Sequence, residues 1–322
     1  MARRTYAIVL AGGEGSRLYD LTTTPTGVRV PKQFCSLAGG PTLLRQTLEG
    51  AAALMPRERI FVVVAEQHRA WWQRELADLP RENVLAQPAG RGTAPAILLA
   101  ALAISRRDPG ASAILLPSDH HVGDEVTLRG AFRSALDEVE RTPERITLLG
   151  VTPDAPDSQY GWIVPKAGAG AAVRPIDLFV EKPPAERARE LMARGGLWSG
   201  FLFACRVTAL LDAFERAQPA LVRTFLGESS SLHSGASLAA LYASLPQCDF
   251  SRDVLERVAD RLGVLAVPPC GWSDLGTPER VASVLAHRGQ SARTRSAVAQ
   301  PRERRVPVLS LALAWQQTGM AI

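Results

Sequence analysis

The start of the chain, a short apolar run that breaks into closely spaced glycines, constrains the fold more than any other feature. Residues 6–11 read Tyr-Ala-Ile-Val-Leu-Ala, and residues 12–17 read Gly-Gly-Glu-Gly-Ser-Arg. An apolar run without polar alternation is typical of a strand that is covered on both faces. Three glycines in four positions let backbone N–H groups turn toward a polyanion, and Arg17 and Lys32 can supply positive charge. We therefore expect a buried strand that ends in a phosphate-binding loop, with a plain tight turn as the alternative.

This loop does not match the two commonest phosphate-binding motifs. A dinucleotide fingerprint needs a further glycine where Leu18 stands, and an acidic residue about 20 positions later to hold a ribose. A P-loop needs a Gly-Lys-Ser/Thr sequence at the end of a longer glycine spacing, which is also absent. The loop alone therefore does not identify its ligand.

Short aliphatic runs alternate with helical patterns along the first half of the chain. The runs predict strands at 6–10, 60–65, 84–86, 113–116 and 146–151, and the patterns predict helices at about 43–54, 67–79, 94–105 and 128–140. This order predicts an α/β fold with a doubly wound, mostly parallel sheet, in which ligands gather at the carboxyl ends of the strands. Thr93 is expected to cap the helix from residue 94, or to contact a nucleotide, and Pro95 fits its first turn.

The pattern changes after residue 153, where strands at 160–164 and 178–180 are joined by a Gly/Ala-rich loop. We interpret residues 153–205 as a small lobe. Helical stretches at 208–215 and about 252–262 precede a last strand at 264–267.

Charge and cysteine content exclude several classes of protein. The formal charge is +5, and the segment 286–305 accounts for the whole excess, so nucleic-acid binding is not expected. The four cysteines are far apart and lack the spacing of a zinc site. No targeting signal or membrane span is visible, so we expect a cytoplasmic protein.

Six segments recur in a characteristic order: Gly12–Leu18, Pro31–Phe34, Gln87–Pro95, Pro117–His120, Glu181–Pro183 and Gly271–Gly276. In this order the chain resembles the sugar-1-phosphate nucleotidyltransferases, and among them it is most similar to the bacterial mannose-1-phosphate guanylyltransferases. The resemblance extends from about residue 5 to residue 285. It implies a Rossmann-like nucleotidyltransferase fold, whose lobe covers the sugar, and a reaction that joins a nucleoside triphosphate to a sugar 1-phosphate with Mg²⁺.

Nucleotidyl transfer needs positioning and charge neutralisation more than acid–base chemistry. We expect Arg17, Lys32 and Asp119 to be catalytic, and the resemblance adds Asp274 to Asp119 as a second Mg²⁺ ligand. Carboxylates suit Mg²⁺, although either aspartate has a turn or helix cap as its alternative role. The nucleotide-binding residues are expected to be Leu10, Ala11, Gly12, Gly13, Gly15, Ser16, Gln87, Arg91 and Thr93, of which Gln87 and Arg91 face the base by resemblance.

The resemblance also implies the sugar-phosphate side of the site, which consists of Gly161, Glu181, Lys182, Ser199 and Gly200. Glu181 can accept hydrogen bonds from sugar hydroxyls, and Lys182 can pair with the phosphate. For His120, an orienting role is expected rather than a transition-metal site, because adjacent histidines in one turn diverge.

The chain departs from the resembled family at several positions. The usual Glu-Pro is Gln87-Pro88, and Trp198 stands where an amide is expected to touch the sugar. GTP and mannose 1-phosphate are the expected substrates. A different base or hexose, such as glucose 1-phosphate with dTTP or UTP, and a non-catalytic nucleotide-sugar-binding regulator remain open.

The C-terminal part carries none of these motifs. We expect a catalytic domain at 1–285 and, at 286–322, a flexible basic connector followed by a short apolar tail. The tail, residues 306–322, contains no charged residue and is expected to pack on its own domain or to form a homodimer.

Overall fold

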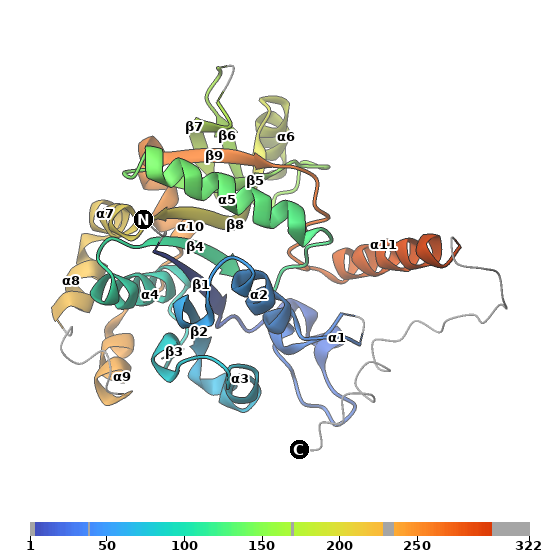
Figure 1. Ribbon diagram of the computed structural model, residues 1–322, viewed down its shortest axis with the longest axis horizontal. Helices are drawn as coiled ribbons and strands as arrows, with labels where there is room; N and C mark the ends of the chain where they lie inside the picture. The colour runs from blue at the N-terminus through green and yellow to red at the C-terminus, as the bar shows by residue number, and fades with distance from the viewer. Residues whose placement is uncertain (1–3, 38, 169–170, 228–234, 298–322) are drawn as a thin grey trace.

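The computed structural model describes residues 4–37, 39–168, 171–227 and 235–297. Within these residues one nine-stranded sheet has the order β3-β2-β1-β4-β8-β5-β9-β7-β6, and β6 also pairs with β8 (Figure 1). The strands are β1 Thr5–Ala11, β2 Ile60–Ala65, β3 Val84–Gln87, β4 Ser112–Pro117, β5 Ile146–Val151, β6 Gly161–Pro165, β7 Val173–Val180, β8 Leu197–Arg206 and β9 Leu262–Val267. The predicted strands of the first half are confirmed within one residue at each end.

The helices cover both faces of this sheet. They are α1 Tyr19–Thr22, α2 Leu43–Ala52, α3 Arg69–Glu75, α4 Thr93–Arg107, α5 Glu125–Arg141, α6 Ala185–Ala193, α7 Val207–Ala217, α8 Pro219–Gly227, α9 Gly235–Ser244, α10 Phe250–Asp253 and α11 Pro278–Ala297. One apolar core joins the sheet to α4, α7 and α8, and a second joins the opposite face to α2, α3 and α5. Successive residues of β1 enter opposite cores, because side chains alternate along a strand.

The prediction of a mostly parallel sheet is correct for one part of the molecule and wrong for another. Strands β1 to β4 are parallel, and so are β5 and β9. Strand β8, which the sequence analysis did not predict, lies antiparallel between β4 and β5. Its register shifts opposite Leu148 and Gly150, close to Phe201 with a φ of +54°. The fold is therefore α/β with a mixed sheet.

Residues 153–205 extend this sheet, because β7 pairs with β9 and β6 pairs with β8. Together with α6 they enclose a small apolar cluster of their own, at the top of Figure 1. The predicted lobe is thus continuous with the main sheet.

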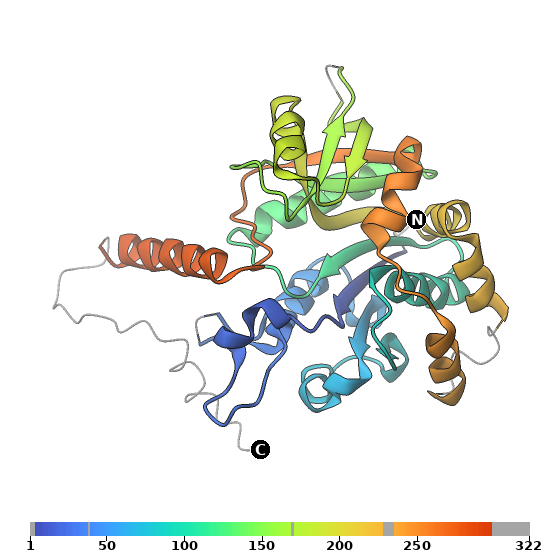
Figure 2. The same cartoon turned by 180° about the vertical axis from the view of Figure 1, so that it is seen from behind.

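Helix α11 extends away from the rest of the described protein (Figure 2). It runs to Ala297, so the first part of the predicted connector is helical. The remainder of the connector and the apolar tail, residues 298–322, lie outside the described residues. In the described part of the chain, no helix is long and apolar enough to span a membrane.

Helix α4 begins differently from the expectation. Gly92 is its N-cap and Thr93 its first residue, so the predicted capping role of Thr93 is wrong, whereas Pro95 does lie in the first turn. Gly92 has a φ of +88°, and a Cβ there would lie 2.2 Å from the carbonyl oxygen of Cys248. Only glycine combines this conformation with so close a backbone approach.

We expect the Gly92→Ala variant to lose about 2 kcal/mol or more of unfolding free energy, because the added methyl group clashes with rigid backbone. Thermal melting should show a decrease of several degrees. Gly90→Ala is the matched control, since nothing lies within 4 Å of a Cβ at that position. Equal melting temperatures for the two variants would contradict the steric account.

Candidate active site

The centre of the candidate site is the ammonium group of Lys32, whose side chain is only 8% exposed. Its Nζ lies 3.0 Å from Asp119 Oδ2 and donates to the carbonyl oxygens of Asp274 at 2.7 Å and Leu275 at 3.4 Å. A buried ammonium is unfavourable unless it is paired and hydrogen-bonded. The segments predicted to bind phosphates and metal therefore meet at one cation.

Asp119 follows β4 and is the more open of the two predicted metal ligands, with 39% of its side chain exposed. Burial by itself raises the pKa of Asp119, but the nearby Lys32 charge and smaller contributions, which include hydrogen bonds to the carboxylate, together outweigh that effect and lower the pKa. Asp119 is therefore ionised at neutral pH. Ser118 fixes the start of this turn by donating to the carbonyl oxygen of Leu10 at 2.7 Å.

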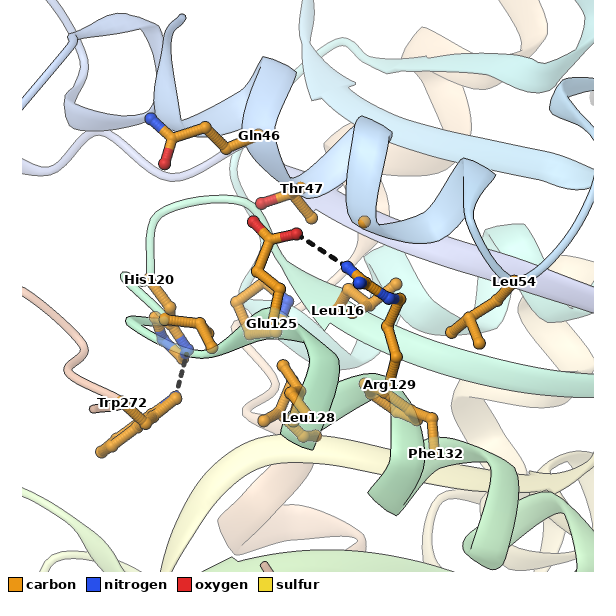
Figure 3. Close-up of a pocket in the computed structure, with 14 residues that line it drawn as sticks. Gln46, Thr47, Leu54, Leu116, His120, Glu125, Leu128, Arg129, Phe132 and Trp272 are labelled. Carbon is orange, nitrogen blue, oxygen red and sulfur yellow. Dashed lines mark hydrogen bonds and ion pairs between the residues drawn. The ribbon is translucent and has the colours of Figure 1, made fainter. Parts of the chain in front are cut away.

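His120 holds the turn after β4 against the turn after β9. The indole Nε1 of Trp272 donates to His120 Nδ1 at 3.3 Å, and the two rings meet edge to face (Figure 3). Burial lowers the pKa of His120, so the imidazole is neutral at neutral pH. Because Nδ1 accepts from Trp272, the ring proton is assigned to Nε2, which lies 3.7 Å from Asp119 Oδ1. Backbone hydrogen bonds between His121 and Ser273 join the same two turns. This geometry supports the orienting role expected for His120.

The glycine loop after β1 is shaped by the segment that carries Lys32. The buried amide of Gln33 donates to the carbonyl oxygens of Ala11 at 2.9 Å and Gly13 at 2.8 Å. Gly15 has a φ of +63°, and a Cβ there would lie 2.9 Å from Lys32 Cβ. The loop thus folds directly over Lys32.

The exposed side chain of Arg17 lies beyond this loop. Its guanidinium donates to Gln159 Oε1 at 2.8 Å, which links the loop to the segment before β6. Ser16 is also exposed, in the short 3₁₀ helix that follows the glycines.

The carboxylate of Asp274 is largely occupied by protein donors. Its Oδ1 accepts from the Tyr160 hydroxyl at 2.9 Å, the Gly276 N–H at 3.0 Å and Arg280 at 2.9 Å, and Arg280 also reaches Oδ2 at 3.1 Å. Arg280 pairs with Asp157 as well, and lies 4.3 Å from the centre of the Tyr160 ring. The alternative role considered for Asp274, the stabilisation of a turn, is therefore observed, because its carboxylate accepts from the N–H of Gly276.

The two carboxylates fit a divalent cation by their chemistry. Carboxylate oxygen is the ligand type that Mg²⁺ prefers, and the Asp119 carboxylate lies at the Lys32 ammonium, which also binds the backbone carbonyl of Asp274. Asp119 is accessible as it stands. Asp274 has its freer atom in Oδ2, whose hydrogen-bond partner among the described residues is Arg280.

The residues predicted to bind the nucleotide beyond β3 contact the segment 242–250. Gln87, 6% exposed, donates from Nε2 to the Tyr242 hydroxyl at 3.0 Å. Arg91 donates to the carbonyl oxygen of Tyr242 at 2.8 Å. Thr93 accepts from the N–H of Phe250 at 2.8 Å. This loop is thus held in place by contacts distant in the sequence.

The predicted sugar-side residues also come together. A Cβ on Gly161 would lie 2.6 Å from Glu181 Oε2 and 3.2 Å from Ser199 Cβ, and a Cβ on Gly200 would lie 3.4 Å from the Trp272 ring. Glu181 is 10% exposed and its carboxylate lies 3.5 Å from the Lys182 ammonium, which is 55% exposed. Burial raises the pKa of Glu181, and Lys182 offsets part of that rise.

The side chain of Trp198 is packed inside the protein and does not line an open surface of the predicted sugar side. It is 8% exposed and packs between Tyr160, with ring centres 4.6 Å apart, and Trp162, at 6.3 Å. Its indole Nε1 is buried without a hydrogen-bond partner among the described residues.

Sequence reasoning missed several residues that organise the site, namely Gln33, Tyr160, Tyr242 and Arg280. Gln33 lies within the recognised segment Pro31–Phe34 and Tyr160 directly precedes the predicted site residue Gly161, so their positions were available as a signal. Arg280 lies in the first turn of α11, the helix that follows Asp274. Tyr242 carries no local signal, because its role depends on a helix 155 residues from Gln87.

Several named proteins are similar to this chain in sequence. A mannose-1-phosphate guanylyltransferase of Escherichia coli (strain K12) is 32% identical over 300 residues, which cover 88% of this chain and 60% of that protein. The xanthan biosynthesis protein XanB of Xanthomonas campestris pv. campestris (strain B100) is 32% identical over 290 residues, with the same coverage of 88% and 60%. The chain therefore spans less than two-thirds of the length of these relatives.

Solved structures are also similar to this chain in fold. A crystal structure described as a mannose-1-phosphate geranyltransferase from Thermus thermophilus matches with a TM-score of 0.72 and 33% identity, over 85% of this chain and 76% of that one. A UDP-glucose pyrophosphorylase complexed with UDP-glucose, at 14% identity and a TM-score of 0.56, shares the fold over 90% of this chain and 99% of that one. The family model described as nucleotidyl transferase matches residues 6–290, so the chain belongs to the nucleotidyl transferase family.

Proposed function

We propose that this protein transfers the nucleotidyl group of GTP to mannose 1-phosphate, giving the nucleoside diphosphate sugar and pyrophosphate. The observation that carries the proposal is the meeting of the glycine loop, Asp119 and the Asp274 turn at the Lys32 ammonium. The guanylyltransferase name of the Escherichia coli relative supports the choice of base and sugar. We propose residues 1–285 as the catalytic unit and a cytoplasmic location for it.

The arrangement of charges supports the following reaction. A phosphate oxygen of the sugar 1-phosphate attacks the α-phosphorus, and the bond from that phosphorus to the bridging oxygen breaks, so that pyrophosphate leaves. Lys32 lies beneath the glycine loop, where it can neutralise the α- or β-phosphate. Arg17, exposed beyond the loop, is proposed to stabilise the leaving pyrophosphate. A Mg²⁺ ion held by Asp119 and Asp274 would neutralise phosphate charge and orient its oxygens.

The sugar phosphate is assigned to the opposite side of the site. Lys182 offers an exposed ammonium to the phosphate, and Glu181 beside it offers carboxylate oxygens to sugar hydroxyls. Gly161 allows the Glu181 carboxylate and Ser199 to lie close against its backbone, and Ser199 is proposed to contribute a hydroxyl to the sugar.

A screen of pyrophosphate release tests the whole proposal. The purified protein is incubated with Mg²⁺ and each of the four common nucleoside triphosphates, paired with mannose, glucose and galactose 1-phosphates. GTP with mannose 1-phosphate should give the highest kcat/KM. Preference for another pair would redirect the base or sugar assignment, and no release with any pair would favour a non-catalytic binding protein.

We expect Asp119→Asn and Asp274→Asn each to lower kcat by about two or more orders of magnitude, the scale of losing a principal electrostatic group. Circular dichroism should show an unchanged fold. Asp212→Asn, an exposed carboxylate on α7, is the control and should leave turnover unchanged. Near-wild-type turnover of Asp119→Asn would contradict the metal assignment.

The two exposed cations should affect different substrates. Arg17→Ala should impair use of the triphosphate, whereas Lys182→Ala should raise KM for the sugar phosphate by about tenfold or more, because each removes one charge-assisted contact. Lys166→Ala removes an exposed ammonium elsewhere and serves as the control. If both variants changed the KM of the same substrate equally, the proposed division of the site would be wrong.

A further inference from the structure

The turns after β4 and β9 carry the two carboxylates of the candidate site, and their backbones are joined. His121 and Ser273 form an isolated antiparallel bridge, so Asp119 and Asp274 lie on the same side of it. Lys32 Nζ bonds to Asp119 Oδ2 at 3.0 Å and to the carbonyl oxygen of Asp274 at 2.7 Å. These contacts bring the two acidic residues together at one end of the bridge.

The Asp274 carboxylate already has a cation, the guanidinium of Arg280. One nitrogen of Arg280 lies 2.9 Å from Oδ1 and 3.1 Å from Oδ2. Oδ1 also accepts from the Tyr160 hydroxyl and the Gly276 N–H, so among the described contacts Oδ2 is the oxygen with room for another partner. An ion pair with Asp157 and the ring of Tyr160, 4.3 Å away, hold the guanidinium in place.

A metal ion and Arg280 cannot both lie close to Oδ2 without repulsion. A divalent cation that binds Oδ2 would lie about 2.1 Å from this oxygen. The Arg280 nitrogen is 3.1 Å from the same oxygen, and both side chains are largely buried, so little water separates the two positive charges. The cation can therefore bind Asp274 well only when Arg280 leaves Oδ2.

We propose that Arg280 is a positioning residue that competes with a divalent cation for Asp274 Oδ2, and that it thereby weakens metal binding to the free protein. Negative charge from a bound phosphate would offset the repulsion, so Arg280 favours entry of the metal together with a phosphate. The inference rests on the proposed function for the Mg²⁺ site at Asp119 and Asp274.

Metal binding in the absence of substrates tests this inference. The probe is Mn²⁺, which also prefers oxygen ligands, and the spectrum of free Mn²⁺ in electron paramagnetic resonance gives Kd. We expect Kd to fall by about tenfold or more in Arg280→Gln, which removes the charge but keeps a donor for Asp157. Arg280→Lys retains the charge and should stay within about threefold of wild type.

Arg206→Gln is the matched control. Arg206 also pairs with a carboxylate, that of Glu140, but it lies opposite the first residue of β4, at the other end of that strand from Asp119. Its substitution should leave the Kd for Mn²⁺ unchanged. A melting curve verifies that each variant is folded.

A second background separates competition at Asp274 from a general change of charge. In Asp274→Asn the contested carboxylate is absent, so adding Arg280→Gln should change Kd by less than about twofold. A general electrostatic effect would instead persist in this background. An equal fall of Kd in both backgrounds, or a fall below about threefold with Asp274 present, would overturn the inference.

The wild-type protein supplies a second measurement that does not depend on the folding of Arg280→Gln. Saturating Mg²⁺ should shift the guanidinium resonances of Arg280 in a nitrogen-15 NMR spectrum, because the contact with Oδ2 is lost. These resonances are identified by their absence from the spectrum of Arg280→Lys. Unchanged resonances at saturating Mg²⁺ would overturn the inference.

The outcomes also separate this inference from the proposed function. Tighter Mn²⁺ binding that depends on Arg280 and Asp274, without release of pyrophosphate from any substrate pair, would support the inference and refute the proposed catalysis. Pyrophosphate release with the same Kd for wild type and Arg280→Gln would refute the inference and leave the transfer reaction standing. Binding of Mn²⁺ to neither protein would refute the inference as well.

Discussion

The buried ammonium of Lys32 is the interaction on which the rest of the site depends. It bonds to Asp119 and to the Asp274 backbone, 242 residues away in the sequence, and the glycine loop folds over its side chain. Without these oxygens the charge would be strongly unfavourable in so closed a place. The same pairing keeps Asp119 ionised, so that a cation and an anion lie side by side at the centre of the candidate site.

Around this cation, one network connects the proposed nucleotide side to the proposed sugar side. Arg280 binds the Asp274 carboxylate, pairs with Asp157 and stacks on Tyr160. Tyr160 precedes Gly161 and contacts Trp272, which holds His120 beside Asp119. Because these groups share partners, a substitution of one of them should disturb the others, and the effects of two substitutions on stability or activity should not be additive.

The sequence predicted the features that depend on neighbouring residues, but not those that depend on residues distant in the sequence. Apolar runs identify the parallel strands because burial on both faces removes polar residues. Strand β8 escaped prediction because glycine and polar residues interrupt its first half, where it bends to pair with β5 and β6. The N-cap was misassigned to Thr93 because Gly92, with its positive φ, already occupies that position. Tyr242 and Arg280 could not be predicted, because their partners come together only through tertiary packing.

The most direct test is the turnover of a Lys32→Met variant, which keeps an unbranched side chain only one heavy atom shorter and removes its charge. Pyrophosphate release from GTP and mannose 1-phosphate is measured beside a melting curve that verifies folding. The account predicts that kcat falls by about two or more orders of magnitude in a folded protein. Turnover within about threefold of wild type would contradict the claim that this buried charge organises the site.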